Sequence, residues 1–329
     1  MNSATQRWRA DYDEAPCGSS VRPATSPDHL AAVAHLFGVD PPPVADARVL
    51  EIAAAADLLP SAADLAALGK FDFVICHGVY SGVPAHIRDA ILATIRTALA
   101  PQGVAYVSYH VQPGWEFEEA RHDSSITPCY FVDFVEHLDT HDLVYLADAR
   151  AETMYAADHH EDTAQELIDE CQSQLELEQC LDFVRHRTFR QSLLVHAHRA
   201  AQIRYDIGPD RFPALHFATS LSVTDGFTRF DHSTQHYGAP GTQQIYTNDH
   251  GVKAAIDVLS ARWPYTVTWP ELTASTRDRL AAAGLEVPAD VQTRIDTLLQ
   301  MLLVRGLVRY RLNSVEPTGD PITPGVFTR

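Results

Sequence analysis

The sequence predicts an α/β fold built on one strand–helix–strand unit that lies between residues 71 and 115. Residues 73–76 form a short apolar run, which is typical of a buried strand. Within 87–99 an isoleucine or leucine recurs at every fourth position and lines one face of a helix. Residues 104–109 then predict a second strand. Such a unit has parallel strands and a right-handed connection, so a ligand site is expected just beyond the carboxyl ends of the strands.

Only one short element fits between this unit and the strand that precedes it. Residues 48–52 predict a strand, and 27–37 upstream of it carry the apolar spacing of a helix. From Glu51 to Phe71 there are 20 positions, whereas a complete strand–helix–strand unit takes roughly 30 residues. We therefore expect one short helix in this interval and a core of three parallel strands.

The remainder of the chain predicts two smaller units. Helices are expected near 131–138 and 165–184, with a strand or bend at 141–149 and a small β element within 202–246. From residue 247 onward a helix, a Trp-Pro turn, two more helices and an alternating strand predict a winged-helix-like α+β unit. The proline-rich end is expected to be disordered.

The composition indicates a globular protein with an acidic surface. The chain has 329 residues, 46% of them hydrophobic, and a net charge of −18. That charge argues against nucleic acid and anionic membrane surfaces as partners, because both are themselves negative. Five cysteines without a Cys-x-x-Cys pair, no long apolar run and no signal peptide predict a cytoplasmic protein. A protein is the expected class of partner.

Two motifs carry a family resemblance. The stretches FDFVICHGVYSGVP and GVAYVSYHVQPGW resemble the fourth and fifth strands of class I S-adenosylmethionine-dependent methyltransferases, in the subgroup with a methyltransferase regulatory domain. YDEAPCGS near the start and FVRHRTFRQSLLVHAH further along are similar as well. The resemblance implies a truncated Rossmann-like methyltransferase sheet and a mainly helical regulatory domain, followed by the winged-helix-like unit. The expected division is 1–115, 116–246, 247–316 and a tail at 317–329.

The same resemblance implies a cofactor and its site. S-adenosylmethionine would lie at the carboxyl edge of the sheet, against Glu51, His77, Gly78 and Tyr80. Tyr109 and His110 would serve the methyl acceptor. The tyrosine would orient or help to deprotonate an amine, and the histidine would act as a base with a pKa near neutral. Among relatives a protein lysine is such an acceptor. Gly82 stands where they often have tryptophan.

The chain departs from the family pattern where the cofactor should be held. Relatives follow the first strand with a Glu-x-Gly-x-Gly-x-Gly turn, but here Glu51 and Ile52 are followed by four alanines. The short interval to Phe71 leaves out the second and third strands, together with the acidic residue that holds the ribose. We therefore predict a methyltransferase-family protein whose own activity is impaired or lost.

Several alternatives stay open at this point. The chain could be a non-catalytic pseudoenzyme that acts as a protein-binding or regulatory module. A partner chain, or a homodimer, could instead supply the missing part of the sheet. A third interpretation is an internally deleted gene product that exposes an unpaired strand edge.

No metal site is expected from the sequence. There are 17 histidines, but we identify no pair with the HExxH spacing, and no cysteine cluster supports zinc. The run His159-His160-Glu161-Asp162 is predicted to be a solvated loop. His196 and His198 would share a face only on a strand, and their segment is predicted to be helical. DNA binding by the winged-helix-like unit is disfavoured by the net charge.

Overall fold

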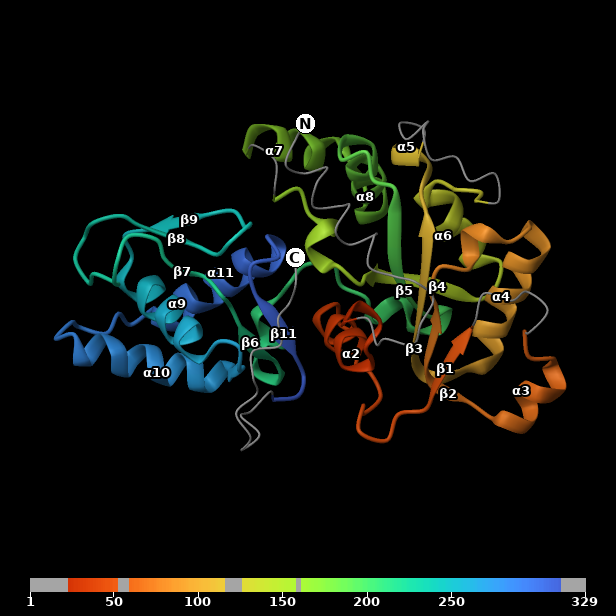
Figure 1. Ribbon diagram of the computed structural model, residues 1–329, viewed down its shortest axis with the longest axis horizontal. Coiled ribbons are helices and arrows are strands. Elements are labelled where there is room, and N and C mark those ends of the chain that lie inside the picture. Colours follow the sequence, from red (N-terminus) through yellow and green to blue (C-terminus); the bar gives the residue numbers. More distant parts are fainter. Residues whose placement is uncertain (1–22, 53–58, 116–125, 158–160, 315–329) are drawn as a thin grey trace.

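The computed structural model describes residues 23–52, 59–115, 126–157 and 161–314 (Figure 1). A five-stranded mixed sheet lies at its centre, in the order β1-β2-β3-β5-β4. The strands are β1 (Val49–Ile52), β2 (Phe71–Cys76), β3 (Leu99–His110), β4 (Leu143–Asp148) and β5 (Phe189–His196).

The three expected parallel strands are confirmed, and two more strands complete the sheet. β1 pairs with β2 in parallel, with Ile52 opposite Cys76, and β2 pairs in parallel with β3. β5 is antiparallel to both β3 and β4. The prediction of a helix around residues 196–198 was wrong, because β5 runs to His196 and only a 3-10 turn follows it. These residues are extended because their backbone pairs with β3 on one side and with β4 on the other.

Both faces of the sheet are covered, which explains why its central strands are almost continuously apolar. On one face lie α4 (Ala85–Ala98), α6 (Phe131–Asp139) and α8 (Gln174–Val184). On the other face α2 (Pro27–Leu36) packs against β3 and β4 (Figure 1). The short helices α3 (Ala62–Leu68), α5 (Gln112–Trp115) and α7 (Glu161–Glu170) lie at the periphery. The last eight residues of β3 are all buried.

A buried network of charges fastens α8 to β5. The guanidinium of Arg190 is fully buried and donates hydrogen bonds to the carboxylates of Glu178 and Asp182, at 2.7–2.9 Å. It also lies 3.7 Å from the centre of the Phe131 ring. Beside it, Arg187 donates to Asp148 at 2.6 Å. Each buried charge here has a partner of opposite sign, which is the condition under which burial of charges is tolerated.

The carboxyl-terminal part forms the small α+β unit that the sequence predicts. Helices α9 (His250–Arg262), α10 (Trp269–Ala282) and α11 (Val291–Val304) pack around a three-stranded sheet, β10-β6-β11. Those strands are β6 (His216–Ala218), β10 (Val267–Thr268) and β11 (Arg309–Arg311). A second small sheet holds β7 (Ser222–Val223), β8 (Gln235–Gly238) and β9 (Ile245–Thr247). α10 begins with a capping box made by Thr268 and Glu271.

The fold class is therefore confirmed, whereas the four-part division stays a prediction. β4 and β5 come from residues 143–196 but complete the sheet begun by residues 49–110, so one sheet spans the expected boundary at residue 115. The expected tail at 317–329 and the four alanines after Ile52 lie outside the described residues. Within the described part of the chain, every helix is too short or too polar to cross a membrane.

Candidate functional site

The carboxyl edge of β2 and β3 is built by a loop that two serines hold in place. Gly78 follows β2 with φ +70°, a left-handed conformation that glycine adopts without strain. Its N–H donates to Ser108 Oγ at 2.8 Å, and the N–H of His110 donates to Ser81 Oγ at 2.8 Å. These two bonds fix the loop of residues 77–83 against the end of β3.

His77 belongs to a group of rings on the face of the sheet opposite α4. Its Nδ1 lies 3.1 Å from both the Tyr106 hydroxyl and Ser108 Oγ. Its ring stacks on Tyr106 with centroids 5.9 Å apart, and Phe189 of β5 lies edge-on at 6.2 Å. The side chain of His77 is part-buried, so one side of this ring group reaches the surface.

His110 lies on the same face, next to that group. Its ring is 5.2 Å from Phe189 and 4.8 Å from Trp115, both in edge-to-face contact. Burial lowers the pKa of His110 to about 4, which differs from the near-neutral value that we expected. The imidazole is therefore neutral at physiological pH, and it is a weaker base than its expected role requires.

Tyr80 and Tyr109 point into the opposite face and belong to the core. Tyr109 is completely buried, stacks on Phe134 at 4.0 Å and shares a 3.1 Å hydrogen bond with Ser192. Tyr80 packs edge-on to Phe134 at 5.2 Å, and its hydroxyl is 2.6 Å from Nδ1 of His137. Burial raises the pKa of both phenols well above the usual value. In this arrangement both hydroxyls are engaged inside the protein.

The six predicted site residues therefore fall into three places. His77, Gly78 and His110 lie together at the carboxyl edge, Tyr80 and Tyr109 lie beneath it on the other face, and Glu51 is exposed on the outermost strand β1. Their assignments to cofactor and acceptor stay predictions.

Sequence reasoning missed the residues that hold the edge together. Arg88 donates to the carbonyl of Thr127 at 2.7 Å and lies over the Tyr80 ring at 5.3 Å. Gly114 packs so closely on the backbone of His186 and Arg187 that an added Cβ would collide with it. Ser81 and Ser108 carried no sequence signal, because single serines near strand ends are common and their partners lie about 30 positions away.

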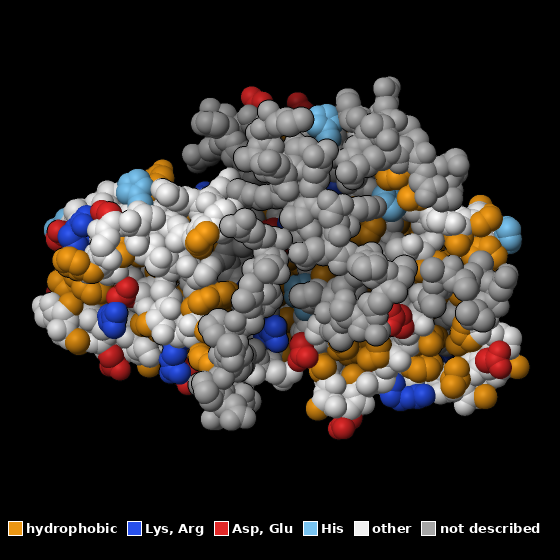
Figure 2. All heavy atoms as spheres, in the orientation of Figure 1, with side chains coloured by type: hydrophobic (Ala, Val, Ile, Leu, Met, Phe, Trp, Pro, Cys, Tyr) orange, Lys and Arg blue, Asp and Glu red, His pale blue; other side chains and the backbone are white. Residues whose placement is uncertain are grey.

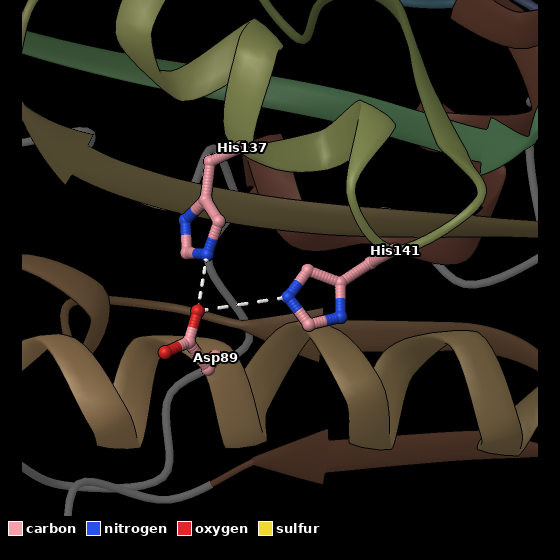
Figure 3. A group of neighbouring side chains, drawn as sticks. All are labelled: Asp89, His137 and His141. Atoms are coloured by element: carbon pink, nitrogen blue, oxygen red, sulfur yellow. Dashed lines mark hydrogen bonds and ion pairs between the residues drawn. The ribbon is translucent and has the colours of Figure 1, made fainter.

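A second missed group lies between α4 and α6. Asp89, His137 and His141 bring one ligand atom each to within 4.8 Å of one another (Figure 3). The expectation that no histidine pair has the HExxH spacing was wrong: His137 and His141 have it, although Leu138 stands where that motif has its glutamate.

Two hollows in the surface lie away from the carboxyl edge. One, of about 800 Å³, is lined by residues 40–43, Asp72, residues 100–102 and Arg199, at the opposite end of β2 and β3. The other, of about 370 Å³, lies in the carboxyl-terminal part between Phe227, Tyr237 and Arg279. Neither is lined by a residue that the sequence assigned to the site.

Comparison with known proteins agrees with this architecture. Residues 123–196 match the family model described as "Predicted methyltransferase regulatory domain". A solved structure, PKMT2 from Rickettsia typhi, superposes with a TM-score of 0.75 at 18% identity, covering 91% of this chain and 78% of that one. PKMT2 in complex with AdoHcy superposes with a TM-score of 0.73 at 19% identity, covering 90% of this chain and 77% of that one.

Among curated sequences, an uncharacterized protein of Rickettsia prowazekii (strain Madrid E) is 26% identical over 290 residues. The match covers 56% of this chain and 52% of the relative, so the chain spans about half the length of that protein. Because 56% of 329 residues is far fewer than 290, the alignment contains long gaps on the side of this chain. That is what internal shortening predicts.

The expected resemblance is therefore confirmed at two levels. The fold is that of the PKMT2 structures, and residues 123–196 match the family model of a predicted methyltransferase regulatory domain. In this chain that segment supplies α6, α8, β4 and β5, so it is part of the central sheet.

Proposed function

We propose that this chain is a methyltransferase-related protein whose own S-adenosylmethionine-dependent transfer is impaired or lost. S-adenosylmethionine is the cofactor that its ancestry supports, because the similar PKMT2 structure is described in complex with AdoHcy. A protein lysine is the proposed acceptor of the lineage, and a protein is the proposed partner. We also propose that the protein is cytoplasmic, and that it binds neither nucleic acid nor membranes because its net charge is −18.

The observation that carries the proposal is the position of β1. Among the described residues β1 is the outermost strand of the sheet, and it pairs directly with β2. α3 is the one described helix between them, and the six residues 53–58 are too few to add a strand–helix–strand unit. Among the described strands, none therefore corresponds to the one whose acidic residue would hold the ribose.

The remaining residues fit the cofactor only in part. The β2 side keeps a suitable rim, because Gly78 brings bare backbone to the edge and His77 lies part-buried beside it. On the β1 side, Glu51 is the one predicted site residue that the structure describes, and it is exposed on this strand. A site with one wall should bind a nucleoside-sized ligand weakly, since most of such a ligand's surface is normally buried on binding. The described residues therefore provide only part of a site for methyl transfer.

A second candidate function is supported by the exposed edge itself. Val49 on β1 and Leu68 at the end of α3 leave 43% and 48% of their surfaces exposed. Figure 2 shows hydrophobic side chains over the lower right of the molecule, the region where Figure 1 places β1, β2 and α3. Apolar surface beside an open strand edge favours association with another chain. In this alternative the protein is a binding module or one part of a larger enzyme.

Calorimetric titration of the purified chain with S-adenosylhomocysteine tests the proposal. We expect no saturable heat at micromolar ligand, because one wall of the pocket is missing. Saturable binding at micromolar affinity with one site per chain would show an intact pocket and would overturn the proposal. Transfer of tritiated methyl groups from S-adenosylmethionine to a lysine-rich protein, measured in parallel, should stay at the rate of a no-enzyme control.

A further inference from the structure

Three side chains that could ligate a metal converge between two helices on one face of the sheet. Asp89 lies in the second turn of α4, His137 near the end of α6, and His141 in the turn after α6 (Figure 3). Nε2 of His137 is 2.7 Å from Oδ1 of Asp89, and Nε2 of His141 is 3.7 Å from the same oxygen. Figure 3 shows both imidazoles directed at this carboxylate from the side of α6.

We propose that Asp89, His137 and His141 form a binding site for one divalent transition-metal ion of the zinc class, which would fasten α4 to α6. Two imidazole nitrogens and one carboxylate oxygen are a donor set that zinc accepts, with a fourth position left for water. This metal site does not depend on the proposed loss of methyl transfer.

The spacing of the donor atoms suits such an ion after small side-chain rotations. Metal–ligand bonds of about 2.0–2.2 Å place tetrahedral ligand atoms roughly 3.3 Å apart. In the structure the three atoms lie within 4.8 Å of one another, with one pair shorter than that ideal and one pair slightly longer. An ion at their centre would replace the proton that now joins His137 to Asp89.

The orientation of His137 is already fixed by an outer partner. Its Nδ1 is 2.6 Å from the hydroxyl of Tyr80, which is only 2% exposed and packed between aromatic rings. Histidine ligands typically use one ring nitrogen for the metal and the other for such a hydrogen bond, which sets the tautomer and the ring plane. With a metal on Nε2, Nδ1 would carry the proton and donate it to the Tyr80 oxygen.

The backbone around His141 is also held, while the carboxylate remains accessible. The N–H of His141 donates to the carbonyl of Leu138 at 2.9 Å, and the Thr140 hydroxyl donates to the carbonyl of His137 at 2.8 Å. The side chain of Asp89 is 60% exposed, compared with 24% and 18% for the two histidines. An ion can therefore enter from the solvent on the Asp89 side, and the net charge of −18 favours cations near the surface.

The test is zinc titration of the full chain, made without a histidine tag and stripped with a chelator. We expect one tight site per chain with a dissociation constant in the micromolar range or below. Asp89→Ala and His141→Ala should each weaken binding at least tenfold. Tyr80→Phe should weaken it roughly 10–100-fold through the orientation of His137. Circular dichroism checks that each variant is folded.

His236→Ala is the matched control, because His236 is an exposed histidine on β8, far from the cluster in the chain and in another sheet. It should bind zinc like the wild type. Cobalt substitution adds a direct readout, since tetrahedral Co²⁺ gives strong visible absorption that Asp89→Ala should abolish. Absence of a saturable site, or equal zinc affinity in the wild type and His141→Ala, would overturn the proposal and leave the three residues as ion pairs only.

Discussion

The inner strands β3 and β5 and the outer strand β1 belong to one sheet, but their surroundings differ sharply. β5 is paired on both sides, and Arg190 on it is buried with two carboxylates and an aromatic ring. β1 has four residues, one pairing partner and an exposed Val49. The sheet is therefore paired and buried where residues 123–196 join it, whereas the β1 edge, where a cofactor would be expected, is short and exposed.

This difference shows how a shortened methyltransferase fold can keep a stable core. Residues 123–196 contribute strands β4 and β5 to the sheet and the helices α6, α7 and α8 beside it, so the hydrophobic core and the buried charges do not depend on further strands next to β1. Under the function that we propose, the loss falls at the β1 edge, where it would remove part of a ligand site and leave Val49 exposed. We therefore propose that stability and cofactor binding are separable in this molecule.

The largest expected effect is at the centre of the sheet. Arg190→Met should lower the free energy of unfolding by about 3–5 kcal/mol, because Glu178 and Asp182 would stay buried without their partner. Arg48→Met at the edge is the matched control. Its guanidinium donates to two exposed carbonyls, so the expected loss is about 1 kcal/mol. Urea denaturation measures both, and equal losses would contradict the comparison.

A tightly packed glycine should also be sensitive. Gly114→Ala should cost roughly 1–3 kcal/mol, because the new methyl group meets the backbone of His186 and Arg187. Gly82→Ala, on the loop at the carboxyl edge, has no atom within 4 Å of the new carbon and should change stability by less than about 0.5 kcal/mol. Thermal unfolding of the two variants gives the comparison, and a larger loss at Gly82 would contradict the packing described.

Acidification should destabilise the protein partly through His110. Its pKa is lowered by burial from 6.5 to about 4, so the unfolded chain binds more protons than the native one between these values. The stabilising contribution is complete above pH 6.5 and is lost as the pH falls toward 4. His110→Phe cannot be protonated and should lose less stability on acidification than the wild type does.

Urea midpoints at about pH 7 and about pH 5 measure this difference between the two chains. His29 and His196, whose pKa values burial also lowers, should supply the pH dependence that remains in the variant. An unchanged pH dependence in His110→Phe would show that His110 is not buried as a neutral ring.

The smallest effect on stability is expected at the outer edge. Val49→Lys places a charge on an exposed edge strand and should change unfolding free energy by about 0.5 kcal/mol or less. Charged residues on edge strands oppose pairing with other chains, so any self-association at high concentration should decrease. Sedimentation velocity of the two chains measures this, and stronger association of the variant would argue against β1 as a contact surface.

The sequence predicts most of the fold because its signals are local. Apolar runs and helical spacing find β1, β2, β3 and α4, and the short interval after Glu51 reveals the missing strands by length alone. β5 was not predicted, and the segment around residues 196–198 was predicted to be helical, since the strand character of β5 depends on pairing with β3 and β4, which are distant in the chain.

The site was harder to predict because it depends on which face a side chain takes. Neighbours in β3 point to opposite faces, so Tyr109 enters the core beside Phe134 while His110 joins the rings around Phe189. The low pKa of His110 follows from burial, which a motif does not encode. Asp89 and His137 are 48 positions apart, and only the packing of α4 beside α6 joins them.

Hydrogen exchange followed by mass spectrometry, with and without saturating S-adenosylhomocysteine, tests the central claim most directly. Amide exchange reports local stability along the chain. In the free chain we expect slow exchange in β3, β4 and β5 and fast exchange in β1. When the ligand is added, we expect no change in exchange at residues 48–52 or 77–81. Strong protection of β1 in the free chain would show that this edge is as stable as the inner strands, and ligand-dependent protection of both segments would show a complete cofactor site. Either result would contradict the account.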